Sequence, residues 1–243
     1  MKSATNFSIT GTVHTQPINV INGGGTNSTF TTAFKENNPD IIIIGFDYHP
    51  DAAVIDTLAN FVNIKKGFLL MLSEADVISE YTSNSALLTK ILGSSVTVED
   101  APNPNGGGTM RPFITDDTNP LINGPFFEEG LGGKYWGEDA TRTDCIRTLP
   151  PGCVSLSTVQ TNVYTIVWKE NANFVYIGDG GFGAGNLIDI SSVIYPCTIN
   201  ALDSTPRPKT QYNNIPNVGG VYNSYFFANI IAYAIKWVQE NKM

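Results

Sequence analysis

Residues 40–76 decide the fold. They open with Asp-Ile-Ile-Ile-Ile-Gly at residues 40–45 and close with Gly-Phe-Leu-Leu-Met-Leu-Ser-Glu-Ala-Asp at residues 67–76. Between these runs, apolar residues at positions 54, 55, 58, 59, 61 and 62 follow the spacing of an amphipathic helix. Short runs that are apolar on both faces are typical of buried parallel strands. The stretch therefore predicts a β-α-β unit within an α/β fold.

The flanking sequence extends this unit into one α/β domain over residues 18–243. Residues 18–21, Ile-Asn-Val-Ile, predict a first core strand that a glycine-rich turn follows. Residues 1–17 predict an edge strand or a lead-in from a preceding domain. The other predicted elements are helices at 29–37, 85–92 and 224–241 and strands at 94–99, 154–158, 163–169 and 173–177. A turn at residues 170–173 predicts that the last two strands form an antiparallel hairpin in a mostly parallel sheet.

Composition narrows the possible partners. The 243 residues carry 14 Lys and Arg against 22 Asp and Glu, a net charge of -8, which disfavours binding to a phosphate backbone. Three cysteines at unrelated spacings predict no metal site. The longest apolar run, residues 226–235, is too short to span a bilayer. Few Lys and many Asn and Thr residues favour an exported bacterial protein, in the periplasm or at the cell surface.

Several segments together resemble the class I glutamine amidotransferase-like superfamily, and most closely its trehalose-utilisation-type branch. They are residues 39–45, 58–62, 66–72, the Asn-Pro-Leu-Ile-Asn-Gly-Pro at 119–125 and the Tyr-Ile-Gly-Asp-Gly-Gly at 176–181. The resemblance implies a flavodoxin-like, three-layer α/β fold. It also implies a catalytic Cys directly after the strand at 67–72 and a His just beyond the late strand. This chain has Ser73 and Asp179 to Phe182 there, so glutaminase activity of that type is not expected.

Ser73 has two interpretations. As a nucleophile it needs a base, and His49 follows a neighbouring predicted strand, with an acid such as Glu138 to orient the ring. As a residue that follows a strand, Ser73 is also a typical helix N-cap, with Asp76 three residues later.

The glycine-rich segment at 178–183 matches Gly-x-Gly-x-x-Gly. A dinucleotide fingerprint belongs at the first βα turn and opens a helix, whereas this match lies late in the chain before a loop. Asp179, Asn186 and Asp189 lack the ordered spacing of a calcium loop. No cofactor and no metal are therefore predicted.

Tyr135, Trp136, Glu138 and Asp139 form the most chemically suggestive segment. An aromatic pair beside two acids suits the lining of a site for carbohydrate or a small polar ligand. The alternative is that Trp136 plugs the end of the sheet while both acids stay solvated. Paired carboxylates for glycoside hydrolysis have five candidates: Glu128, Glu129, Glu138, Asp139 and Asp179.

The sequence thus predicts a non-catalytic amidotransferase-like module that binds a ligand or other domains of a larger exported chain. Its pocket is expected at the carboxyl ends of the strands, in the loops after Ile21, Gly45, Leu72 and Ile177, with residues 135–139 and Asp179 contributing. The alternatives are a serine hydrolase that uses Ser73, His49 and Glu138, and a carbohydrate-active enzyme that uses carboxylates.

Overall fold

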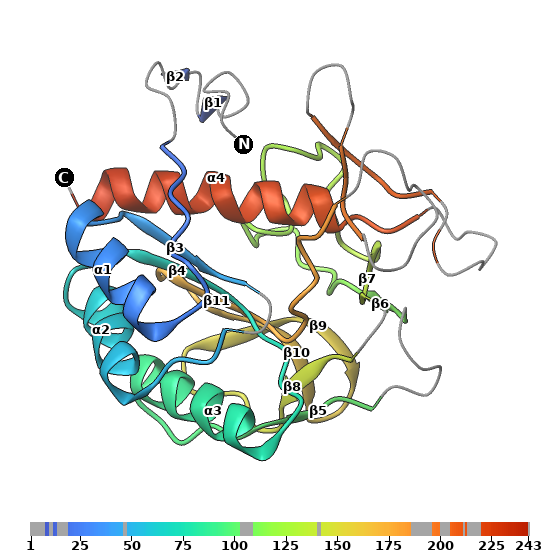
Figure 1. The fold of residues 1–243 in the computed structure, drawn as a ribbon. Coiled ribbons are helices and arrows are strands. Elements are labelled where there is room, and N and C mark those ends of the chain that lie inside the picture. Colours follow the sequence, from blue (N-terminus) through green and yellow to red (C-terminus); the bar gives the residue numbers. More distant parts are fainter. Residues whose placement is uncertain are drawn as a thin grey trace.

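The protein is a three-layer α/β structure (Figure 1). The structure is a computed structural model that describes residues 8–9, 12–13, 19–45, 48–102, 109–139, 142–185, 196–199, 205–210, 212 and 220–242. Helices α1, α2 and α3 cover one face of a seven-stranded sheet, and α4 crosses the other face. The α/β class and the layered arrangement agree with the prediction.

The elements have the following bounds. The helices are α1 (Asn27–Asn37), α2 (Ala52–Asn63), α3 (Ile78–Leu92) and α4 (Asn223–Asn241). The sheet strands are β3 (Ile41–Ile44), β4 (Phe68–Leu72), β5 (Val98–Asp100), β8 (Asp144–Ile146), β9 (Cys153–Gln160), β10 (Val163–Lys169) and β11 (Phe174–Ile177). Three separate pairs are β1 (Ser8–Ile9) with β2 (Thr12–Val13), β6 (Met110–Pro112) with β7 (Tyr135–Gly137), and β12 (Thr198–Ile199) with β13 (Pro206–Arg207).

The sheet is parallel at one end and antiparallel at the other. Its order is β3-β4-β11-β10-β8-β5, with β9 also paired to β10. Strands β3, β4 and β11 run parallel. Every other pair in this sheet is antiparallel, including the predicted hairpin of β10 and β11. The hairpin is thus confirmed, and the antiparallel part continues beyond it to β8 and β5.

The predicted β-α-β unit is confirmed as β3, α2 and β4. Asp51 caps α2, because its carboxylate accepts a hydrogen bond of 2.9 Å from the Val54 N–H. Helix α2 turns six apolar side chains inward, at the positions that the spacing predicted. All five residues of β4 are buried, as expected for a parallel strand with helices on both faces.

The two faces of the sheet carry separate cores. On one face, Leu69 and Met71 of β4 pack with α2 and α3. On the other face, Phe68, Leu70 and Leu72 pack with Phe226 and Ile230 of α4. Successive side chains of β4 point to opposite faces of the sheet, so this one strand contributes to both cores.

Several predicted boundaries differ from the structure. Residues 19–21 lie outside any strand, and Ile18 is not among the described residues. Helix α3 begins at Ile78, because the Glu80 carboxylate accepts hydrogen bonds from the N–H groups of Asp76 and Val77. Helix α4 begins at Asn223, one residue before its predicted start, and the Ser224 hydroxyl donates to the Arg207 carbonyl at 2.5 Å. Among the described residues, none of the helices is both long and apolar enough to cross a membrane.

Asn173 connects the start of β11 to the end of the β-α-β unit. Its buried side-chain amide donates to the carbonyls of Val62, at 2.8 Å, and Gly67, at 2.6 Å. We predict that Asn173→Ala lowers the free energy of unfolding by about 1–3 kcal/mol, because it leaves buried carbonyl groups unsatisfied. Urea denaturation measures this loss. The control Asn60→Ala alters an exposed residue of α2 and should change stability little; equal losses in both variants would contradict the assignment.

Candidate functional site

The carboxyl ends of β4 and β11 bring two distant segments together. Because the strands are parallel neighbours, residues 73–75 and 178–182 leave the sheet at the same edge. The Ser73 N–H donates to the Ile177 carbonyl at 2.9 Å. Ser73, Glu74 and Asp179 are all buried. This edge therefore holds polar groups away from solvent.

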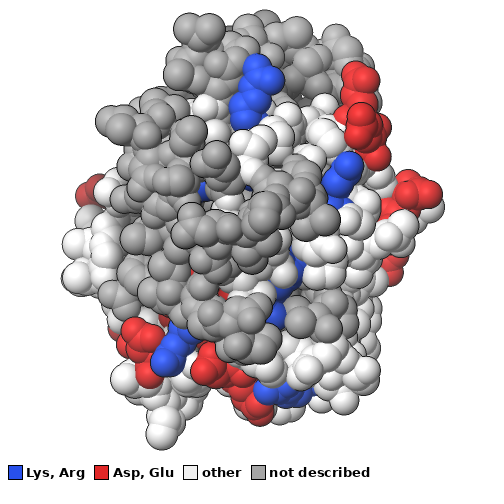
Figure 2. All heavy atoms as spheres, turned by 90° about the vertical axis from the view of Figure 1, so that its right-hand side faces the viewer, with Lys and Arg blue, Asp and Glu red and all other residues white. Residues whose placement is uncertain are grey.

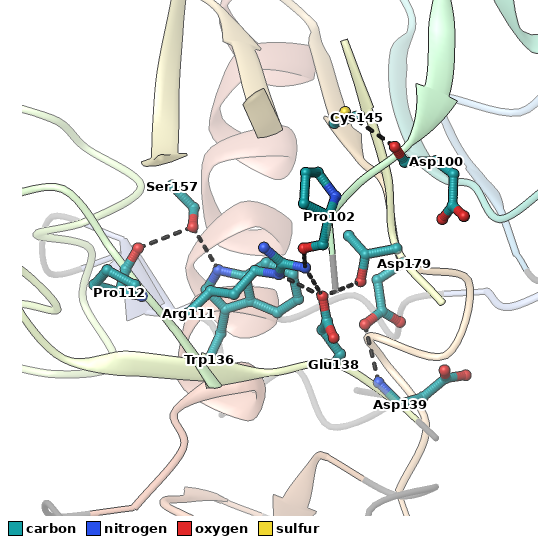
Figure 3. Close-up of polar contacts among 11 residues, drawn as sticks. Asp100, Pro102, Arg111, Pro112, Trp136, Glu138, Asp139, Cys145, Ser157 and Asp179 are labelled. Carbon is teal, nitrogen blue, oxygen red and sulfur yellow. Dashed lines mark hydrogen bonds and ion pairs between the residues drawn. The ribbon is translucent and has the colours of Figure 1, made fainter. Parts of the chain in front are cut away.

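The β6–β7 pair brings two oppositely charged side chains to this edge (Figure 3). The Arg111 guanidinium forms an ion pair with Glu138, and neither side chain is exposed. Glu138 also accepts a hydrogen bond of 2.5 Å from the Thr143 hydroxyl. The Arg111 guanidinium also donates to the Pro102 carbonyl at 3.3 Å. A buried charge requires such partners, because its desolvation is costly.

Five carboxyl groups are buried among the described residues: Glu74, Glu138, Asp139, Asp144 and Asp179. We call these five residues the acid centre. The Asp139 N–H donates to the Asp179 carboxyl at 3.0 Å (Figure 3). The Asp144 N–H donates to the Gly178 carbonyl at 2.5 Å. Backbone contacts thus connect the segments that carry these acids.

Burial and mutual repulsion keep protons in the acid centre. Burial raises the pKa of Asp179 well above its ordinary value, and the negative charges of Asp139, Glu138 and Glu74 raise it further. Burial likewise raises the pKa of Asp144 to about 8, with contributions from Glu74 and Asp100. The Ala75 N–H opposes this shift, although among the described residues no atom meets hydrogen-bond geometry with the Asp144 carboxyl. Burial and the neighbouring acids therefore favour the protonated, neutral form of both Asp179 and Asp144.

Gly181 permits the close approach of Asp139. A Cβ atom at Gly181 would lie 2.0 Å from the Asp139 Oδ2 atom, which is far inside van der Waals contact. Glycine at this position thus allows the carboxylate to lie against the backbone after β11. A Cβ atom at Gly178 would likewise lie 1.9 Å from the Asp144 carbonyl oxygen, and no helix opens in the described residues 178–185.

Lys209 is the second buried cation near this edge. Its exposed fraction is 2%, and its ammonium lies 6.0 Å from the centroid of the Tyr212 ring. Burial raises the pKa of Tyr212, and the charges of Asp179, Glu138 and Asp139 add to the shift. Burial raises the pKa of Cys197 most. The negative charge of Asp179 raises it further, and the positive charge of Lys209 lowers it. Lys209 and Tyr212 therefore lie within electrostatic range of the acid centre.

Ser73 and His49 have different partners. The Ser73 hydroxyl accepts a hydrogen bond of 2.6 Å from the Asn84 side-chain amide. The Nε2 atom of His49 lies 3.6 Å from the Glu80 carboxylate. The prediction that Ser73 caps a helix is wrong, because α3 begins at Ile78 and its first N–H groups are capped by Glu80. The predicted hydrolase trio of Ser73, His49 and Glu138 is thus divided among three sets of contacts.

Trp136 faces the interior. Its side chain is fully buried, its indole N–H donates to the Ser157 hydroxyl at 2.8 Å (Figure 3), and its ring packs 5.5 Å from that of Phe182. This fits the alternative in which Trp136 plugs the end of the sheet. Glu138 and Asp139 differ from both interpretations, because they are buried rather than solvated. Tyr135 is half-buried, and its carbonyl accepts a hydrogen bond from the Tyr222 N–H.

The remaining candidate ligands lie elsewhere. Glu128 and Glu129 are exposed, and Glu129 lies 3.9 Å from the Lys134 ammonium. Asn186 and Asp189 are outside the described residues. In the described part of the chain, no group of three or more His, Cys, Asp or Glu side chains has the arrangement of a metal site. On the face seen in Figure 2, described Lys and Arg side chains lie dispersed among Asp and Glu, without a continuous basic stripe.

Three residues near the site were not predicted: Arg111, Asp144 and Lys209. Arg111 follows a Gly-rich stretch of sequence, and Asp144 precedes a short apolar run, but neither position carries a local pattern that predicts burial. Lys209 lies in a Pro- and Asn-rich segment. Their burial depends on contacts between segments far apart in the chain, which sequence spacing does not report.

The chain is similar to known proteins in structure rather than in sequence. No family model matches the chain, and no curated protein matches it. Among solved structures, one similar fold belongs to a candidate GMP synthase subunit from Thermoplasma acidophilum. The two share 10% sequence identity with a TM-score of 0.48, and the similarity covers 87% of this chain and 80% of that chain.

Asp144 makes stability depend on pH in a defined window. An unfolded Asp has a pKa of about 3.9, whereas that of folded Asp144 is about 8. Between these values the folded state holds a proton that the unfolded state has released, so this acid's contribution to stability is lost as pH rises from about 4 to about 8. We predict that Asp144→Asn, which cannot titrate, gains stability relative to the wild type across this window. Urea denaturation at a series of pH values tests this.

Asp117→Asn alters an exposed carboxylate and is the matched control for that experiment. Its stability relative to the wild type should not change with pH in the same way. A constant difference between Asp144→Asn and the wild type from pH 4 to pH 8 would contradict the raised pKa.

The Arg111–Glu138 pair should be costly to break. We predict that Glu138→Gln destabilises the protein by about 3–5 kcal/mol, because the buried guanidinium loses its counter-charge. Glu129→Gln removes the same charge from an exposed pair and should cost about 0–1 kcal/mol. Thermal unfolding of both variants gives the comparison, and similar shifts would contradict the buried pair as a stabilising contact.

Proposed function

We propose that this chain is a non-catalytic module of the amidotransferase-like α/β type, which acts by binding within a larger assembly. The observation that carries the proposal is the contact between Ser73 and Asn84. The Ser73 hydroxyl accepts a hydrogen bond from a side-chain amide, and an amide N–H cannot take a proton from serine. A serine nucleophile requires a base at that position.

The position of the expected histidine supports the same proposal. Asp179 follows β11 there, and its buried carboxyl has a pKa well above the ordinary value. A neutral carboxylic acid does not act as a general base. In place of a nucleophile and a base, the edge of the sheet carries Ser73 and Asp179, both in internal contacts.

Enclosure of the acid centre favours binding over carboxylate catalysis. Glycoside hydrolysis uses a pair of carboxyl groups, and Asp179 and the Arg111-paired Glu138 are two carboxyl groups of this edge. Both side chains, however, have no exposed surface. Hydrolysis would require this pair to open to a glycan, so this role is the second candidate. We also propose an exported location and a relationship to the trehalose-utilisation-type branch. Both rest on the sequence features alone.

Labelling with a serine-reactive fluorophosphonate tests the first proposal. We predict no labelling of the folded wild type, because Ser73 is 4% exposed and its described side-chain partner is the Asn84 amide, which is not a base. Ser73→Ala should match the wild type, and a commercial serine esterase serves as the positive control. Labelling that Ser73→Ala abolishes would overturn the non-catalytic assignment. Release of reducing sugar from a glycan panel, lost in Glu138→Gln, would instead support the second candidate.

A further inference from the structure

Strand β3 has the sequence of a central strand at the edge of the described sheet. It consists of four isoleucines, and Ile42 and Ile44 are buried. The strand order begins with β3, so only β4 pairs with it among the described strands. Natural edge strands usually carry charges, prolines or bulges that prevent pairing with another strand. Strand β3 has none of these, which points to a further strand beside it.

The outer backbone groups of β3 are available for such pairing. The Phe68 N–H donates to the Asp40 carbonyl at 3.0 Å, so the backbone N–H and C=O groups of Asp40 face β4. Because successive residues of a strand alternate, the N–H and C=O groups of Ile41 and Ile43 point away from β4. Within the described part of the chain, these groups have no backbone partner. They form a template for one added strand.

A cavity of about 440 Å³ lies along this open edge. Strand β3 forms one wall, Phe30, Ala33 and Phe34 of α1 form a second, and residues 21–25 form a third. We call this cavity the β3 slot. Its volume is within the usual range for ligand pockets, about 300–1,000 Å³. No charged side chain of the described residues lines it, although the whole chain has a net charge of -8.

We infer that the β3 slot binds one extended, uncharged apolar strand of a partner polypeptide, which pairs with the backbone of Ile41 and Ile43. This inference rests on the proposed role as a binding module, and it specifies the chemistry of the partner. Backbone pairing provides affinity in this mode, and alternate apolar side chains provide fit. The uncharged lining disfavours a charged strand, since a charge in the slot would lose its water without gaining a counter-charge.

Two other occupants fit the slot less well. Ile21 already forms part of its wall, so the segment at residues 19–21 borders the space rather than filling it. A second copy of the chain would bring its own α1 and residues 21–25 to the same place, because these flank the free edge of its β3. The slot is walled on three sides, and it favours a strand that is not already part of a sheet.

Amide hydrogen exchange of the full chain tests the inference. The probe is the capped peptide Lys-Val-Ile-Val-Ile-Lys, whose terminal lysines keep it soluble. At a free peptide concentration of about ten times its Kd, we expect the exchange of the Ile41 and Ile43 amides to slow by about tenfold. The peptide Lys-Val-Pro-Val-Pro-Lys lacks the N–H donors at two positions and should leave exchange unchanged.

Ala33→Glu places a carboxylate in the slot and should abolish the effect of the first peptide. Ala53→Glu adds the same charge at an exposed position of α2 and should bind it as the wild type does. Three results would overturn the inference: no slowing by the peptide, slow exchange of both amides in the dilute chain alone, or slow exchange that depends on protein concentration. The last two would identify the chain's own segment or a second copy as the occupant. None of these three results depends on whether Ser73 reacts with a fluorophosphonate. The inference of strand binding and the proposal of a non-catalytic module can therefore fail separately.

Discussion

The desolvation of five carboxyl groups at one edge of the sheet is the constraint on which the rest of this region depends. Taking an ionised carboxylate out of water costs several kcal/mol, and the described part of this edge holds only two buried cations, Arg111 and Lys209. The raised pKa values of Asp144 and Asp179 favour their protonated forms, which reduces the number of buried charges. The ion pair of Arg111 with Glu138 balances another. The described side chains at this edge thus form a buried polar interior.

This closed interior explains why segments distant in sequence meet where they do. Strands β4 and β11 deliver residues 73–75 and 178–182 to one point. The β6–β7 pair delivers Arg111 and Glu138 to the same region (Figure 3). In an open α/β sheet, the carboxyl edge is where ligands usually bind. Here internal contacts occupy that edge, and a described cavity with an unpaired backbone lies instead along β3.

The sequence predicted the elements whose pattern is local. Apolar runs at β3 and β4 and the helical spacing of α2 were sufficient for the β-α-β unit, because all of β4 and the alternate residues Ile42 and Ile44 of β3 are buried. Alternation and a polar turn were sufficient for the β10–β11 hairpin. The start of α3 was missed because its cap is the side chain of Glu80, inside the helix, rather than Ser73 before it.

The chemistry of the edge was less accessible to sequence reasoning. Glu138, Asp139 and Asp179 were named as candidates from their neighbours, but their burial requires the approach of three separate segments. Trp136 illustrates the difference, since an aromatic residue next to acids has the same local sequence whether it lines a ligand site or fills the interior. Its contacts with Ser157 and Phe182 identify the second role.

The protonation state of Asp179 tests the central claim most directly. Carboxyl ¹³C chemical shifts of labelled aspartate, assigned with the Asp179→Asn variant, report it at pH 7. A closed acid centre predicts that the Asp179 carboxyl is protonated at that pH, because burial and three neighbouring acids raise its pKa. An ionised Asp179 that titrates near the ordinary value of about 3.9 would contradict this account. It would indicate a hydrated edge that is open to substrate.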